Sequence, residues 1–175
     1  PIMKATGAAN VAAFAAGESV PYLEWGMVTG MTNVGILGLT IAMLIFAKSK
    51  QYKSLSKLAL PTSLFNITEP IVFGFPLIMN PVMAIPFILS PVISLLSTTA
   101  VMKIGLIAPI TGAQISTTIP TPIYLAFMNS SISGFVWGTI LVIINVALYI
   151  PFLKIADRMA CKEEAENEAL EAAQQ

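Results

Sequence analysis

The residue in this 175-residue chain with the clearest capacity for chemistry is Glu69. Between Leu58 and Leu153 the only charged side chains are those of Glu69 and Lys103, so this carboxylate stands in a long apolar stretch. Placing a carboxylate in hydrocarbon costs about 2.5–3.5 kcal/mol even on lenient scales, and such groups usually face a cavity, a partner or a substrate. We therefore expect Glu69 to bind a ligand. A carboxylate that only caps a helix is the alternative.

The elements that position Glu69 are predicted to form a re-entrant hairpin. Four prolines at positions 61, 70, 76 and 81 exclude a straight helix here, because proline removes a helical hydrogen bond and clashes with the preceding turn. Two short arms fit, at about Leu58–Phe65 and Ile71–Met79. The polar tip between them contains Asn66, Thr68 and Glu69. Broken backbone at membrane depth is tolerated where protein buries it or where it lines a wet cavity, so the tip is the predicted binding site.

Thr68 and Asn66, the two polar neighbours of Glu69, each have more than one possible role. Thr68 could cap the second arm, with Glu69 and Pro70 in its first turn. Asn66 could face a substrate or satisfy the broken backbone.

Composition identifies an integral membrane protein built of helices. Hydrophobic residues make up 56% of the chain, charged residues 10%, and the mean hydropathy is +0.82, whereas soluble domains carry about 25% charge. The net charge is zero, which excludes an electrostatic footprint for nucleic acid. There is no histidine and only one cysteine, Cys161. We therefore expect no metal site, no internal disulfide and no cofactor.

Three charge-free stretches are predicted to span the membrane, since a helix needs about 20 apolar residues to cross. They are Gly26–Ala47, Pro81–Met102 and Gly134–Leu153. A basic loop at Lys48–Lys57 and a second basic cluster after the last span are expected on the cytoplasmic side. The number of crossings between them must then be even. The two later spans satisfy this, together with a hairpin that enters and leaves on the same side, so the chain has three spans and one hairpin in all. The fold class is all-α, with about three spanning helices and one or two re-entrant hairpins.

A second broken segment, Ile104–Ser131, is also too rich in proline for a straight helix. It is either a second, shallower re-entrant element or a folded outer loop. Its polar side chains at Gln114, Thr117 and Thr118 could line a cavity or satisfy backbone groups.

These elements divide the chain into three parts. Residues 1–25 are predicted to be an interfacial segment or loop, residues 26–153 a substrate-binding membrane domain, and residues 154–175 a solvated, acidic and helix-prone cytoplasmic tail. The first residues lack the pattern of a signal peptide, and the chain reads as a piece of a longer protein.

Several motifs around Glu69 resemble one family of transport proteins. Phe65–Pro70 reads FNITEP and is followed by Gly74, Asn80-Pro81 and the IPFI of Ile85–Ile88. This series is similar to the membrane component, enzyme IIC, of bacterial phosphoenolpyruvate-dependent sugar phosphotransferase systems of the lactose/cellobiose/chitobiose family. The likeness covers nearly the whole chain and corresponds to the C-terminal part of such a protein. The histidine motif of the family is absent.

The resemblance implies a dimeric permease in the bacterial plasma membrane that binds a disaccharide between re-entrant hairpins. A phosphocysteine on a separate cytoplasmic IIB protein or domain would phosphorylate the sugar on its 6-hydroxyl, so the phosphoryl donor lies on a partner. Glu69 would accept hydrogen bonds from sugar hydroxyls, with Asn66 beside it, and could act as a base. From the residues alone, a proton- or ion-coupled secondary transporter that uses Glu69 as its coupling site is the alternative.

Overall fold

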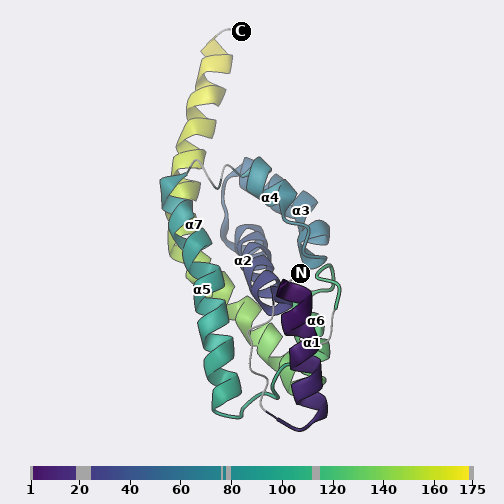
Figure 1. Ribbon diagram of the computed structural model, residues 1–175. Helices are drawn as coiled ribbons and strands as arrows, with labels where there is room; N and C mark the ends of the chain where they lie inside the picture. Colours follow the sequence, from purple (N-terminus) through teal and green to yellow (C-terminus); the bar gives the residue numbers. More distant parts are fainter. Residues whose placement is uncertain (1, 19–24, 76, 78–79, 112–114, 174–175) are drawn as a thin grey trace.

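The computed structural model describes residues 2–18, 25–75, 77, 80–111 and 115–173. All regular secondary structure within these ranges is helical, which confirms the predicted all-α class (Figure 1). The helices of this part of the chain are α1 (Ile2–Ala15), α2 (Trp25–Phe46), α3 (Lys50–Leu64), α4 (Glu69–Gly74), α5 (Pro81–Lys103), α6 (Thr121–Met128) and α7 (Ile132–Ala173).

The predicted spans coincide with the three longest helices. α2 and α5 match Gly26–Ala47 and Pro81–Met102 to within one residue at each end, and α7 contains Gly134–Leu153. Among the described helices, α5 and α7 are long and apolar enough to cross a bilayer, while α2 contributes a shorter apolar stretch, Gly30–Phe46. The crossing of the membrane by α2 therefore stays a prediction.

Helix α2 lies at the centre of the fold and packs against α3, α5, α6 and α7 (Figure 1). A Cβ atom added at Gly38 of α2 would lie 2.6 Å from the Cβ atom of Asn145 on α7, so the glycine permits the two backbones to approach closely. Asn145 in turn accepts a hydrogen bond from the Ser90 hydroxyl (2.5 Å) and donates one to the Ser94 hydroxyl (2.9 Å), both on α5. Asn145 thus joins α7 to α5.

One apolar cluster packs the short helices α3 and α4 against the long ones. Tyr52 of α3, together with Ile71 and Phe75 at the two ends of α4, is buried in the same cluster as Met43 of α2 and Leu153 of α7. Burying such side chains stabilises the fold by roughly 1.5–3 kcal/mol each. The hairpin is therefore part of the folded core.

The predicted basic loop at Lys48–Lys57 is mostly helical, because α3 begins at Lys50. Ser49 occupies the N-cap position, where its hydroxyl accepts a hydrogen bond from the backbone N–H of Tyr52 at 3.1 Å. Such a cap satisfies one of the N–H groups that a helix start leaves without a partner. The connection between α2 and α3 is thus reduced to a few residues.

The terminal segments are both helical. Residues 1–25, predicted to be an interfacial segment or loop, include the helix α1, and their place at the membrane interface stays a prediction. The predicted tail continues α7 without a break to Ala173, which confirms its helical character. It is not solvated throughout, because Ala156, Asp157 and Ala160 are buried.

Candidate functional site

The predicted hairpin is present as α3, a short turn and α4. Asn66 has a φ of 60°, a left-handed conformation that asparagine tolerates better than most residues. The N–H of Asn66 donates to the Ser63 carbonyl (3.1 Å) and that of Ile67 to the Thr62 carbonyl (3.0 Å). This pair of bonds is a Schellman motif, which ends α3 and reverses the chain.

The two arms differ in length from the prediction. The first predicted arm, Leu58–Phe65, is the last part of the longer helix α3. The second, Ile71–Met79, is represented by the six-residue helix α4, which starts two residues earlier at Glu69. Residues 76, 78 and 79 of that arm lie outside the described residues, and the depth of the hairpin in a membrane stays a prediction.

Glu69 opens α4 and is followed by Pro70 in the first turn, as the sequence predicts. Thr68 occupies the N-cap position, but its side chain makes no capping hydrogen bond. Its backbone carbonyl accepts from the N–H groups of Ile71 (3.1 Å) and Val72 (3.0 Å). The Glu69 side chain is exposed and has no hydrogen bond to another described residue. It is therefore free to bind a ligand.

Asn66 connects the hairpin tip to the second broken segment. Its side-chain amide donates to the backbone carbonyls of Thr117 (2.6 Å) and Ile119 (2.8 Å), and the Thr121 hydroxyl lies 3.4 Å from its oxygen. Both N–H groups of the amide are thus used, which supports a backbone-satisfying role. The two segments, more than 50 residues apart in sequence, are held side by side.

The threonines of the second segment lie next to this contact. Thr117 is half-buried, while Thr118 is exposed and its hydroxyl lies 2.8 Å from that of Ser116. Gln114 lies outside the described residues. The structure therefore brings Asn66 directly against the Thr117 backbone, while Thr68 and Glu69 make no hydrogen bond to the described residues of the second segment. The chain then continues into α6, and both interpretations of this segment, a re-entrant element or a folded outer loop, stay predictions.

Two of the cavities in the described part of the chain are apolar. One of about 280 Å³ lies beside the tip between α2, α7 and the start of α6, with Leu64, Pro120 and Pro122 among its lining residues. The other, of about 430 Å³, lies between α5 and α7 near Trp137. Neither cavity is lined by the candidate site residues Asn66, Thr68, Glu69, Thr117 and Thr118. The exposed side chain of Glu69 therefore contributes to neither of these two cavities.

A polar contact that sequence reasoning missed holds the other end of α3. Asp157, on the part of α7 beyond the predicted span, is only 5% exposed. Its Oδ1 atom accepts from the backbone N–H groups of Lys48 (3.0 Å) and Ser49 (2.9 Å), and its Oδ2 atom also accepts from Lys48 (2.9 Å). The buried carboxylate therefore accepts hydrogen bonds from the backbone N–H groups just before α3.

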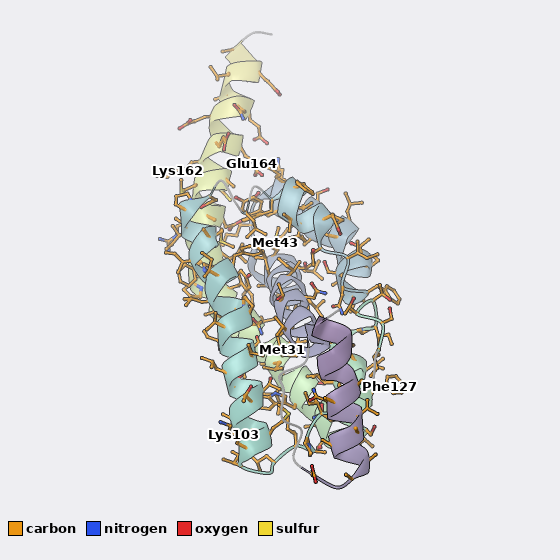
Figure 2. The ribbon with its side chains drawn as sticks, viewed as in Figure 1. Met31, Met43, Lys103, Phe127, Lys162 and Glu164 are labelled. Carbon is orange, nitrogen blue, oxygen red and sulfur yellow. The ribbon has the colours of Figure 1, made fainter. Side chains whose placement is uncertain are left out.

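Glu164, about two turns further along α7, completes this contact (Figure 2). Its Oε1 atom accepts from the Ser49 hydroxyl (2.6 Å) and the Gln51 N–H (3.0 Å), and its Oε2 atom accepts from the Lys50 N–H (3.1 Å). We call Asp157 and Glu164 together the α7 clamp. Carboxylates are favoured at a helix N-terminus by both the free N–H groups and the helix dipole.

The clamp is expected to weaken in acid. The hydrogen bond from Ser49 is the main cause that lowers the pKa of Glu164 below its ordinary value of 4.5. Protection of the first-turn amides of α3 should be full above that ordinary value and be lost as the pH falls through the lowered pKa. Hydrogen exchange of Lys50 and Gln51 measured against pH would show this. Protection that does not change as Glu164 becomes protonated would contradict it.

A sequence signal for this contact exists in the acidic residues that follow the last span. Asp157, Glu164 and Glu168 are spaced so that they fall on one side of a helix. All three contact residues at the start of α3. The contact of Glu168 is an exposed ion pair with Lys50 at 2.8 Å. The signal is recognisable only after α3 is known to start at this point.

Comparison with known proteins gives consistent matches. The family described as "Phosphotransferase system, EIIC" matches residues 1–91. The oligo-beta-mannoside-specific EIIC component of Bacillus subtilis (strain 168) is 35% identical over all of this chain and 41% of its own length. The lactose-specific EIICB component of Lacticaseibacillus casei is 31% identical over 98% of this chain and 31% of its own length.

The fold also matches a solved structure. The transporter ChbC, the IIC component from the N,N'-diacetylchitobiose-specific phosphotransferase system, superposes with a TM-score of 0.87 and 34% identity. The match covers 94% of this chain and 40% of that one. The chain thus spans about two-fifths of the length of curated relatives that it matches.

Proposed function

Since the chain belongs to the phosphotransferase system EIIC family, we propose that it forms the sugar-binding part of a bacterial permease. The substrate is a disaccharide of the cellobiose, chitobiose or lactose type. The hairpin tip binds it through Glu69 and Thr68. Asn66, whose two amide N–H groups are taken by backbone carbonyls, offers its oxygen, and Thr117 and Thr118 of the second segment complete the site. The family does not favour the ion-coupled secondary transporter as an alternative.

The observation that carries this proposal is the joining of the two broken segments at the tip. Asn66 holds the Thr117–Ile119 backbone in place through two short hydrogen bonds. The carboxylate of Glu69 is exposed near this junction and begins α4. An ionised carboxylate only accepts hydrogen bonds, which suits the hydroxyl groups of a sugar.

In this proposal the bound sugar is phosphorylated by a partner. A cytoplasmic IIB protein or domain carries the phosphocysteine, an arrangement supported by the EIICB name of the Lacticaseibacillus relative. Glu69 orients the accepting hydroxyl and can remove its proton during the transfer. The complete protein is a homodimer in the plasma membrane, and its C-terminus is cytoplasmic.

The test is phosphorylation of the sugar by the full-length protein in vesicles. With phosphoenolpyruvate and the complete cytoplasmic phosphotransferase relay, including a IIB protein, inside, we expect external cellobiose, lactose or diacetylchitobiose to accumulate as a 6-phosphate. Omission of IIB should abolish accumulation. Uptake of unmodified sugar that follows an imposed pH gradient would contradict the proposal and support the ion-coupled alternative.

A further inference from the structure

The α7 clamp is connected to Glu69 through a short series of contacts. The Ser49 hydroxyl donates to Glu164 and accepts from the N–H of Tyr52. The ring of Tyr52 lies against that of Phe75, with centroids 4.6 Å apart and planes inclined by 56°. Phe75 ends α4, where its N–H donates to the Ile71 carbonyl, and Glu69 begins the same helix. Each step joins neighbouring, mostly buried groups.

Helix α3 is also fixed at its other end. The Ser63 hydroxyl lies 3.0 Å from that of Thr40 on α2, and both groups are buried. Fifteen residues of helix extend about 22 Å, so the two attachments lie near opposite ends of one rigid rod. A helix attached at one end can change its orientation about that contact, whereas α3, attached near both ends, keeps its orientation.

We propose that the α7 clamp, Asp157 and Glu164, positions the hairpin so that Glu69 points at the sugar. Asp157 and Glu164 are positioning residues, because they act on Glu69 only through α3 and α4. This assignment rests on the proposed function. It explains why a carboxylate is buried at Asp157, since a buried charge is retained where every oxygen receives donors.

The alternative is a local cap that only keeps the first turn of α3 helical. A local cap and a positioning contact both protect the first-turn amides, so exchange of those amides does not distinguish them. The two differ at α4. Loss of a positioning contact changes the place of α4 relative to α7 and weakens sugar binding, whereas loss of a local cap does neither.

The test uses Asp157→Asn in the full-length protein, reconstituted in lipid nanodiscs. The amide keeps the shape of the side chain but offers one oxygen and brings two N–H groups towards the N–H donors of Lys48 and Ser49. For distance measurements Cys161 is replaced by alanine, and nitroxides are attached at Phe73→Cys on α4 and Ile143→Cys on α7. Both positions are exposed, at 79% and 62%. Electron double resonance then reports the α4–α7 distance.

We expect Asp157→Asn to shift or broaden this distance and to raise the dissociation constant for cellobiose about tenfold, the effect of misaligning one charged hydrogen bond. Glu168→Gln is the matched control. It makes the same chemical change on the same side of α7 but removes only the exposed ion pair with Lys50, so neither quantity should change. If Asp157→Asn prevents folding, Glu164→Gln is measured in its place.

An unchanged distance together with unchanged affinity in the clamp variants would overturn the proposal. A change confined to amide exchange in the first turn of α3 would also overturn it, in favour of a local cap. If cellobiose does not bind the unmodified protein, the α4–α7 distance alone distinguishes a positioning contact from a local cap. The proposed function is tested separately. It fails if Glu69→Gln binds sugar as well as the unmodified protein does, even where the clamp variants change the α4–α7 distance.

Discussion

Glu69→Gln is expected to abolish disaccharide binding while leaving the protein inserted and folded. The amide keeps the size of the side chain and one acceptor oxygen but loses the charge, and a hydrogen bond to a charged group is worth about 1.5–3 kcal/mol. Loss of two such bonds to sugar hydroxyls would lower the affinity at least about 100-fold. A calorimetric titration of the full-length protein with cellobiose measures the effect.

The fold should tolerate this change because of the position of Glu69. The side chain is exposed and has no hydrogen bond to another residue in the part of the chain that the structure describes, so the substitution breaks no known internal contact. Thermal unfolding should therefore match that of the unmodified protein. Glu166→Gln serves as the control for the titration, because Glu166 is an exposed residue of α7 that is distant from Glu69 in the sequence. An affinity of Glu69→Gln equal to that of the control would refute the assignment.

Asn66→Asp is expected to separate the two broken segments. The amide of Asn66 donates to two backbone carbonyls, whereas a carboxylate can only accept, so its oxygen would face the carbonyl oxygens of Thr117 and Ile119. Leaving a partly buried acceptor without a donor costs about 1–3 kcal/mol, and there are two of them. We expect a lower unfolding temperature, faster proteolysis within residues 115–120, and weak sugar binding.

Two further variants distinguish the causes of this effect. Asn66→Gly adopts the same positive φ without strain and removes the amide without adding a charge, so it should be less damaging than Asn66→Asp. Asn80→Asp makes the same chemical change at the N-cap of α5. There the side-chain oxygen accepts from the N–H of Val82 at 3.0 Å, and a carboxylate does the same. Equal damage from Asn66→Asp and Asn80→Asp would contradict the role of Asn66.

The long helices were predictable because the membrane imposes a simple requirement on sequence. A span needs about 20 residues without charge, and the bounds of α2 and α5 follow from the first charged or turn-forming residues beyond them. The hairpin was predictable for a related reason. Proline at Pro70 and the polar run before it exclude a continuous helix, and the left-handed residue that reverses the chain is an asparagine, Asn66.

The start of α3 could not be predicted, because the residues that stabilise it are distant in sequence. Lys48–Lys57 is rich in lysine and looks like a loop when its charges alone are considered. The acceptors for its first N–H groups are Asp157 and Glu164, more than 100 positions away. Hydropathy and local propensity contain no information on such a pairing.

The surroundings of Glu69 were also beyond sequence reasoning. The cost of a carboxylate in hydrocarbon correctly indicates that this residue needs polar surroundings, but it does not indicate which residues supply them. In the structure, the polar neighbours at Asn66 and Thr117 bind each other, and Glu69 is left exposed. The five candidate residues therefore stay a prediction that the proposed titrations test.

The unbroken length of α7 offers a practical route to imaging this chain. Its 42 residues extend about 63 Å, roughly twice the 30 Å hydrocarbon core of a bilayer. A folded marker domain joined to Ala173 through a continuous helix would keep a fixed orientation relative to the spans. Such a marker would provide the mass and the asymmetric outline that particle alignment in electron cryomicroscopy requires.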